Sequence, residues 1–362
     1  MPEAVNPERN PENPILIIGG GPAGLEAAKG IAELGYKAVI VEKANVLGGT
    51  PILSSYAALT PDFRSAEDAM GEMIAAVQRP EVDIHLGSQV TAVSGQAGAF
   101  DLTVTSAVDG PTQVQAGAAI IATGFQHFDP GRETQQYGYY EHDDVITLVD
   151  LERMLKAEQV VRPSNGEPPK RLCFIQCVGS RDRQIGNEYC SKVCCGVAAK
   201  ESIEVRKLLP DCKVFIFYID MRMYGYWENE IYWPSQEKYK VNYVKGIATE
   251  IVKKGDHLIV RGEDTTMGRP MEVPMDIVVL SVGMEPSEGT KQMAAMFGAE
   301  VNKYKFIETV GGALNTVQTS VEGVLACGAA TGPADIEDSI SSASAAAMKA
   351  IAVVRKTAMG VS

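Results

Sequence analysis

Short apolar runs rich in β-branched residues alternate with segments of helical periodicity along much of the chain. The run Ile15–Ile18 is followed by apolar residues at helical spacing, Ala27, Ile31 and Leu34, and then by a second apolar run at 38–41. Continuous apolar runs of this length are typical of strands buried on both faces of a parallel sheet. The order strand, helix, strand therefore predicts an α/β fold.

Later apolar runs predict a second α/β unit inserted into the first. Buried strands are expected at 171–176, 213–219 and 276–282, after a region of little periodicity that begins near 125. The chain length of 362 residues suits two domains, or one domain interrupted by another. We expect a flexible tail at 1–13, a discontinuous first domain at 14–126 plus 285–362, and an inserted domain at 127–284.

A glycine-rich turn joins the first strand to the first helix. Gly19, Gly21 and Gly24 follow the G-x-G-x-x-G pattern, and Glu42 ends the second strand. In such a turn the glycines permit a tight bend, let a pyrophosphate approach the backbone and let the helix pack on the strand, while the acidic residue binds ribose hydroxyls. The helix N-terminus also attracts phosphate charge. The pattern predicts a dinucleotide site, because a plain surface turn would not require Glu42 at a strand end.

The dinucleotide is expected to be FAD rather than NAD. The glycine turn lies early in the chain, Gly48-Gly49 follows the acidic residue, and a later strand ends in Ala122-Thr123-Gly124. This arrangement resembles the thioredoxin-reductase-like flavoproteins, which have two dinucleotide-binding domains. The resemblance implies an α/β architecture in which a Rossmann-like FAD-binding domain is interrupted by a second, degenerate dinucleotide-binding-like domain. It also implies that the backbone of Val90 meets the adenine.

The segment 323–330 resembles the second FAD fingerprint of that superfamily. The fingerprint normally ends in Gly-Asp, but here Ala329 follows Gly328, so the usual aspartate contact is absent or is made elsewhere. Asp335 is a plausible N-cap of the alanine-rich helix that follows. The residues predicted to hold FAD are Gly19, Gly21, Pro22, Ala23, Gly24, Glu42, Lys43, Gly48, Gly49, Val90, Ala122, Thr123, Gly124, Gly328, Ala329, Asp335 and Ile336. No catalytic side chain is expected, because electron transfer needs no charged base.

Composition and charge exclude several classes of function. The chain is 45% hydrophobic and 22% charged, which is ordinary for a globular protein. The net charge of −13 argues against nucleic acid and against an anionic membrane surface. No apolar run approaches the roughly 20 residues that span a bilayer. The start of the chain lacks the features of a signal peptide, so we expect a cytoplasmic protein with reduced thiols.

Four of the seven cysteines fall within one short stretch, 177–195. Twelve residues separate Cys177 from Cys190, three separate Cys190 from Cys194, and Cys195 follows at once. This is neither a ferredoxin run nor a C-x-x-C redox or zinc motif. The stretch stands where a pyridine-nucleotide domain would carry its second glycine turn. Four thiolates that converge could hold an iron–sulfur cluster, although a chance group of free thiols is the plain alternative.

These cysteines, together with Ala329 and the run Gly332–Ile336, resemble the A subunit of heterodisulfide reductase. The resemblance covers nearly the whole chain, from 15 to 358. It implies that Cys177, Cys190, Cys194 and Cys195 hold a [4Fe–4S] cluster near the FAD, in a subunit that works within a complex. The ferredoxin-type cluster modules of methanogen members have no counterpart in this sequence. The chain therefore looks like the short form found in bacterial sulfur-oxidising heterodisulfide-reductase-like complexes, and it is similar to a related subunit of the quinone-interacting complex of sulfate reducers.

The resemblance also suggests a function and partners. The FAD and cluster would relay electrons between other subunits of a heterodisulfide-reductase-like complex during oxidation of disulfide or persulfide sulfur. A lipoate-carrying protein is a candidate partner, NAD a candidate acceptor, and a homodimer the family expectation. Two alternatives stay open: a free-standing NAD(P)H-dependent disulfide reductase of the thioredoxin reductase type, and a non-catalytic flavin-bearing assembly subunit. The missing second glycine turn and the missing C-x-x-C pair count against the reductase.

Overall fold

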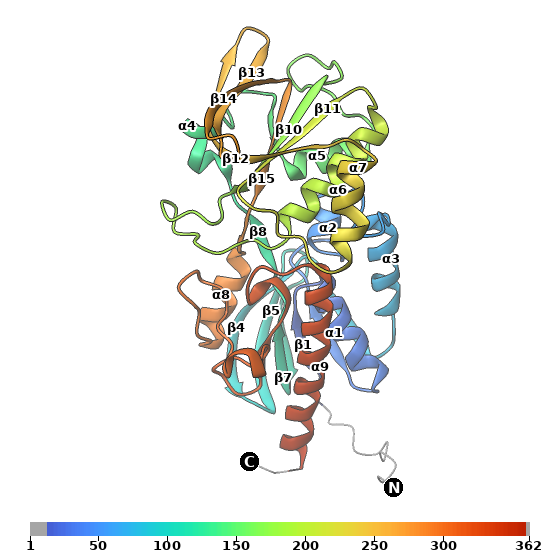
Figure 1. The fold of residues 1–362 in the computed structure, drawn as a ribbon. Coiled ribbons are helices and arrows are strands. Elements are labelled where there is room, and N and C mark those ends of the chain that lie inside the picture. Colours follow the sequence, from blue (N-terminus) through green and yellow to red (C-terminus); the bar gives the residue numbers. More distant parts are fainter. Residues whose placement is uncertain (1–12, 360–362) are drawn as a thin grey trace. The chain divides into compact units, whose positions relative to one another are not determined.

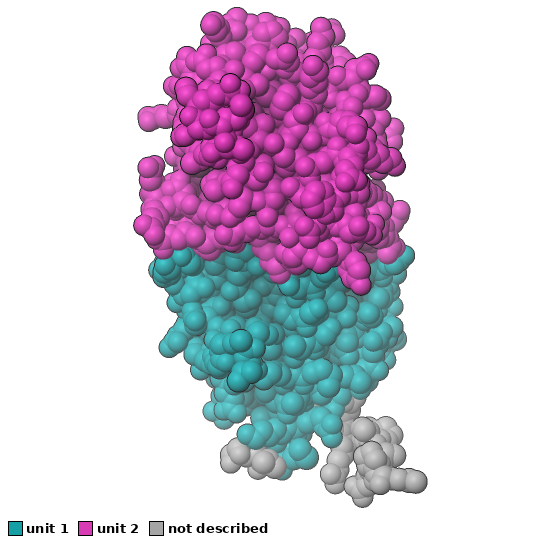
Figure 2. All heavy atoms as spheres, viewed as in Figure 1, with its two compact units in different colours: residues 1–53, 70–126, 285–362 teal, residues 54–69, 127–284 magenta. Residues whose placement is uncertain are grey.

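The computed structural model describes residues 13–359 and divides the chain into two compact units (Figure 2). Unit 1 comprises residues 1–53, 70–126 and 285–362, and unit 2 comprises residues 54–69 and 127–284. Residues 1–12 of the expected tail lie outside the described residues. The chain crosses between the units after residues 53, 69, 126 and 284. Residues 54–69, which the sequence placed in the first domain, belong to unit 2 because they bond to it: Ala57 N donates to Glu152 and Lys200 Nζ donates to Ala58 O.

Unit 1 contains a five-stranded parallel sheet in the order β17-β7-β1-β2-β3 and a three-stranded antiparallel sheet β4-β5-β6 (Figure 1). The small antiparallel set agrees with the alternating pattern of its residues. The strands are β1 (Ile15–Ile18), β2 (Ala38–Val41), β3 (Val82–His85), β4 (Ser88–Gln96), β5 (Ala99–Ser106), β6 (Gly110–Ala116), β7 (Ala118–Ile121) and β17 (Val324–Ala326). The helices are α1 (Pro22–Glu33), α2 (Thr50–Leu53), α3 (Ala66–Ala76, which begins in unit 2), α8 (Glu288–Phe297) and α9 (Ile336–Ala358).

Both faces of the parallel sheet are covered, which explains why its strands are continuously apolar. Ile15 and Ile17 pack in one core with residues of α1 and α9, which lie side by side in Figure 1. Leu16 and Ile18 point to the opposite face and pack in a second core with β4, β5 and α8. Because successive side chains of β1 point to opposite faces of the sheet, the strand contributes residues to two cores.

Unit 2 is built on a seven-stranded mixed sheet in the order β14-β13-β12-β11-β10-β15-β9. The strands are β9 (Val145–Thr147), β10 (Arg171–Val178), β11 (Lys213–Tyr218), β12 (Asn242–Lys254), β13 (His257–Asp264), β14 (Arg269–Met275) and β15 (Ile277–Val282). The helices are α4 (Thr134–Tyr137), α5 (Leu148–Lys156), α6 (Cys194–Leu208) and α7 (Trp233–Glu237). The chain passes between the units in β8 (Phe125–His127) and β16 (Met284–Pro286). Unit 2 also has a 3-10 turn at Pro130–Glu133 and a π turn at Glu228–Tyr232. Unit 1 has 3-10 turns at Gly312–Leu314 and Gly328–Ala330.

Strand β10 occupies the middle of the parallel part of this sheet, between β11 and β15. Leu172 and Phe174 pack in a core with residues of α5 and α6, and Cys173 and Ile175 pack in a core on the other face. The carboxyl end of β10 therefore lies at the edge where open α/β sheets place their ligands. No helix within residues 13–359 combines the length and apolar character needed to cross a bilayer.

Candidate functional site: a glycine-lined dinucleotide site and a group of four cysteines

The glycine turn after β1 is packed so closely that larger side chains are excluded at two positions. A Cβ on Gly24 would lie 1.8 Å from Gly19 O, so the glycine lets α1 begin directly against the turn. Gly19 has a φ of +113°, and its Cβ would lie 2.3 Å from Ala122 O at the end of β7. Pro22 stands in the first turn of α1, where its missing N–H leaves no helical bond unmade. This geometry meets the requirements of a pyrophosphate-binding turn.

The other predicted segments of unit 1 converge on this turn. Gly48 N donates to Gly20 O, and a Cβ on Gly49 would lie 2.6 Å from the Cα of Gly21. A Cβ on Gly328 would lie 2.9 Å from the Cβ of Ala23, in the first turn of α1. The fold thus brings together segments that are far apart in the sequence, near the helix N-terminus that would face a phosphate.

Glu42 is a buried carboxylate that fixes the turn from within. Its Oε2 accepts a hydrogen bond from Gly20 N at 2.6 Å, and its Oε1 accepts one from Ala44 N at 2.7 Å. Each carboxylate oxygen can accept a further bond, so the side chain still has acceptor capacity for a ribose hydroxyl. The sequence predicted the ribose contact and did not predict this role of Glu42 in the turn.

A cavity of about 250 Å³ opens beside the turn. Five of the predicted FAD residues line it: Gly19, Glu42, Lys43, Val90 and Thr123. Residues of α8 that the sequence did not indicate, Glu288, Gly289, Gln292 and Met293, line it as well. A pocket that joins a glycine turn, a buried acid and an apolar wall suits the adenosine end of a dinucleotide.

Helix α8 is tied to the predicted segment Ala122-Thr123-Gly124 by hydroxyl groups. Thr123 and Thr290 share a hydrogen bond of 2.7 Å between their Oγ1 atoms, and Thr290 Oγ1 donates to Gly124 O. Ser287 caps the helix by accepting from Thr290 N, and its own hydroxyl donates to Thr123 O. The Pro-Ser pair before an acidic first turn was a helix-start signal that could have pointed to this contact.

The start of α9 has the cap that the sequence predicted. Asp335 accepts from Asp338 N and Asp338 accepts from Asp335 N, which together form a capping box. Gly328 N donates to Ser342 Oγ of the same helix, so the segment with Ala329 is held against the first turns of α9. Ile336 is the first residue of that helix.

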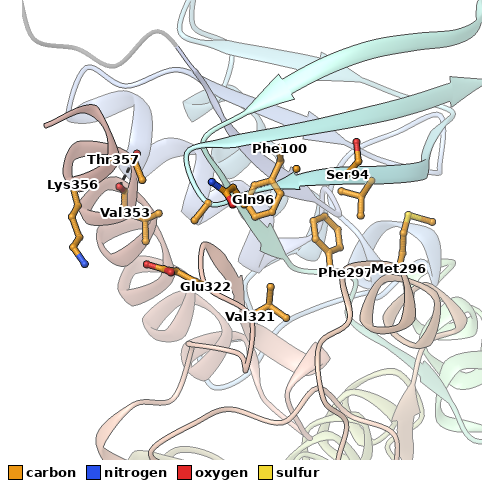
Figure 3. A pocket seen from close by; sticks show the side chains of 13 residues that line it. Ser94, Gln96, Phe100, Met296, Phe297, Val321, Glu322, Val353, Lys356 and Thr357 are labelled. Carbon is orange, nitrogen blue, oxygen red and sulfur yellow. Dashed lines mark hydrogen bonds between the residues drawn. The ribbon is translucent and has the colours of Figure 1, made fainter. Parts of the chain in front are cut away.

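A larger cavity, about 560 Å³, lies elsewhere in unit 1 (Figure 3). Phe100 and Phe297, in edge-to-face contact, line it together with Val321 and the α9 residues Val353 and Lys356. None of the predicted FAD residues lines this cavity. Its greater volume therefore does not make it the dinucleotide site, because the glycine turn and Glu42 lie at the smaller cavity.

In unit 2, the long spacing between Cys177 and Cys190 is folded as a hairpin. Arg181 N donates to Tyr189 O, and Asp182 N donates to Asn187 O, so the two arms of the loop run back along each other. Cys177 has a φ of +67°, a left-handed conformation that is uncommon outside glycine and that redirects the end of β10. The loop thus returns Cys190 toward Cys177.

Cys194 and Cys195 are the first two residues of α6. The thiol of Cys194 lies 3.8 Å from Val282 O, and the sulfur of Cys195 accepts from Arg222 N at 3.5 Å. Cys190 Sγ accepts from Lys192 N at 3.3 Å. The helix N-terminus and these backbone N–H groups favour negative charge on sulfur.

Burial is the main cause of the raised pKa values of Cys194 and Cys195, and the charges of the other cysteines of the stretch add to it. Burial raises the pKa of Cys194 well above its ordinary value, and negative charge on Cys177, Cys195 and Cys190 raises it further. Burial raises the pKa of Cys195 to about 11, with Cys177 and Cys190 contributing in the same direction. By contrast, burial alone raises the pKa of Cys327 to about 12.

The group of four cysteines does not suit a single metal ion. Among residues 13–359, no group of three or more His, Cys, Asp or Glu side chains is arranged to hold one ion. A [4Fe–4S] cluster makes a different demand, because its four thiolates bind separate iron atoms around a larger body. Sulfurs that influence one another without meeting at one point are compatible with that arrangement.

A buried ionic group on α6 was not anticipated from the sequence. Lys200, 1% exposed, lies 2.5 Å from Glu152 and 3.0 Å from Glu204. Glu201 is fully buried, and burial, together with the charge of Glu152, raises its pKa well above the ordinary value. The cluster therefore holds more acids than bases. No motif signals it, because its members come from α5 and α6.

Comparison with known proteins supports the assignment of the fold. Residues 13–175 match the family model described as pyridine nucleotide-disulphide oxidoreductase. The thioredoxin reductase of T. acidophilum covers 96% of this chain and is itself covered to 99%, with a TM-score of 0.65 and 20% identity. Lactococcus lactis thioredoxin reductase has a TM-score of 0.63 at 18% identity, with 95% of this chain and 99% of that chain covered. At these identities the likeness concerns the fold.

Curated relatives are more similar in sequence. The A subunit of the H(2):CoB-CoM heterodisulfide,ferredoxin reductase of Methanothermobacter thermautotrophicus is 41% identical over 244 residues, which is 66% of this chain and 37% of the relative. The iron-sulfur A subunit of the CoB-CoM heterodisulfide reductase of Methanocaldococcus jannaschii is 30% identical over 418 residues, which is 92% of this chain and 63% of the relative. The chain thus spans less than two thirds of these relatives. It is a homologue of the heterodisulfide reductase A subunit and has the FAD-binding fold of the pyridine nucleotide-disulphide oxidoreductases.

Proposed function

We propose that this protein is an electron-transfer subunit that carries FAD in unit 1 and a [4Fe–4S] cluster on Cys177, Cys190, Cys194 and Cys195 of unit 2. The observation that carries the proposal is the placement of these four thiols at the end of β10, after the returning arm of a hairpin and at the start of α6. Burial, followed by the charge of the other three sulfurs, raises the pKa of Cys194, so the four thiols interact electrostatically. The M. jannaschii relative is named an iron-sulfur subunit, which supports the same assignment.

The flavin site would be formed by the predicted residues of the glycine turn and by the segments packed on it. Glu42 and the α8 residues would hold the adenosine end, and the N-terminus of α1 would face the pyrophosphate. Bound flavin supplies a centre that accepts two electrons and releases them singly. The chain's own contribution is to bind and orient the cofactor with a buried acid and closely packed glycines.

The physiological role that fits best is a relay in sulfur metabolism. We expect other subunits of a heterodisulfide-reductase-like complex to supply and receive the electrons, with disulfide or persulfide sulfur as the compound oxidised. A lipoate-carrying protein as sulfur carrier, a homodimeric state and a cytoplasmic location complete the proposal. All seven cysteines are free thiols, which suits a reducing compartment. The connection between β10 and α6 is a cysteine-bearing hairpin rather than a glycine turn, which counts against a free-standing NAD(P)H-dependent reductase.

Iron and acid-labile sulfide per FAD, measured on protein purified without oxygen, test the proposal. We expect about four irons per FAD, the content of one [4Fe–4S] cluster, and an EPR signal after reduction with dithionite. Cys190→Ala should lose the iron, whereas Cys212→Ala, in the same unit but outside the group, should keep it. FAD without iron after anaerobic reconstitution would contradict the cluster, and disulfide turnover with NADH would then support the reductase.

A further inference from the structure

Arg181 lies in the hairpin between Cys177 and Cys190, and its guanidinium is turned inward. The side chain is 19% exposed, although it belongs to a surface loop. Its backbone has a φ of +59°, which is uncommon outside glycine. The neighbouring Arg183, two residues along the same hairpin, is 90% exposed. The charge of Arg181 therefore faces the interior of the loop, whereas the charge of Arg183 faces solvent.

The guanidinium of Arg181 links the hairpin between Cys177 and Cys190 to the loop after β11, which contacts Cys195. Nη1 and Nη2 of Arg181 donate to Oδ1 and Oδ2 of Asp220 at 2.5 and 3.2 Å, a two-pronged contact. Nη1 also lies 3.9 Å from Cys177 Sγ, within hydrogen-bonding distance of sulfur. Asp220 lies just beyond β11, and its carbonyl is 4.0 Å from the sulfur of Cys195. One planar cation thus fixes the surroundings of two of the four sulfurs.

We infer that Arg181 is a positioning residue that raises the reduction potential of the centre held by the four cysteines. This inference rests on the proposed cluster. Reduction adds one electron and therefore one negative charge, while the guanidinium remains protonated. A cation near a ligand sulfur stabilises the more negative state, and hydrogen bonds to the sulfurs tune the potential of such centres. Asp220 offsets part of the charge and holds the donor toward the sulfur.

The test is the midpoint potential of the cluster in the holoprotein, obtained by EPR-monitored redox titration, with iron and sulfide content measured in parallel. Arg181→Gln should lower the ratio of reduced to oxidised cluster about tenfold at a fixed potential, a shift of about 59 mV for one electron. Arg183→Gln is the matched control and should leave the potential unchanged. Arg181→Lys keeps the charge without the planar fork and should give a smaller fall.

Each result has a defined meaning. Wild-type protein that binds no iron would overturn the cluster and this inference together. Wild-type protein with iron, and an Arg181→Gln variant with the same potential as Arg183→Gln, would overturn the inference alone. If Arg181→Gln cannot retain iron, the Arg181→Lys variant decides: a lowered potential with full iron content supports the role, and an unchanged potential refutes it.

Discussion

Replacement of Lys200 by methionine should destabilise unit 2 strongly. Lys200 and Glu152 are 1% and 4% exposed, so the change leaves buried carboxylates without their cation. Removal of one partner from a buried ion pair costs about 3–5 kcal/mol. With a urea m-value of about 3 kcal/mol/M, the midpoint of unfolding should fall by about 1–2 M. The hydrogen bond from Lys200 to Ala58 O is lost as well.

The loss of stability caused by Lys200→Met should depend on pH. Burial raises the pKa of Glu201 and of Glu204, and Lys200 opposes this rise in both. Without Lys200 both pKa values rise further above those of the unfolded chain. A carboxyl whose pKa is raised by folding favours the folded state at low pH, and this stability is lost as pH rises. The loss caused by Lys200→Met should therefore be larger at pH 8 than at pH 5.

Tryptophan fluorescence is a suitable assay, because both tryptophans, Trp227 and Trp233, lie in unit 2. Urea unfolding of the holoprotein would be followed at both pH values. Lys207→Met, at an exposed position of the same helix, is the control and should cost less than about 1 kcal/mol. Equal midpoints for the two variants, or a loss that does not change with pH, would refute the reasoning about the buried charges.

Three further outcomes are expected. Gly24→Ala should abolish stable FAD binding, because the added Cβ would lie 1.8 Å from Gly19 O. The measurement is flavin absorbance per protein. The control is Gly30→Ala on the same helix, whose added Cβ would lie 3.8 Å from the nearest atom and which should keep the flavin. Burial, followed by the charge of Asp182, raises the pKa of Glu133 to about 7, so wild-type stability should fall between pH 5 and 8, and Glu133→Gln should reduce that fall in urea midpoints. Thr147→Ala removes the side-chain cap of α5 and should cost about 1 kcal/mol in the same assay, and no change would mean that the cap is not needed.

Local patterns gave a correct outline of the fold. The apolar runs predicted buried strands in both sheets. The Asp335 cap was predicted because capping depends on residues three apart in sequence. These features can be predicted because neighbouring residues on one strand or helix determine them.

The parts of the sites that the sequence did not reveal depend on contacts between distant segments. Thr290 meets Thr123 across 167 positions, and Arg181 meets Asp220 across 39. No rule of sequence spacing predicts either pair. The packing of α8 on the first sheet creates the first pair, and the packing of adjacent loops in unit 2 creates the second. The same reason explains why the charged cluster around Lys200 has no motif.

The sequence by itself determined the α/β class, the glycine turn with its acid, and the identity and order of the four cysteines. Tertiary structure alone decided that a hairpin would bring Cys190 back toward Cys177, and that the start of α6 would present Cys194 and Cys195 to them. The physical reason is that covalent order fixes which groups are available and which local conformations are favoured. Their distances and their burial, and thus their pKa values and electrostatic coupling, follow from packing among residues far apart in the chain.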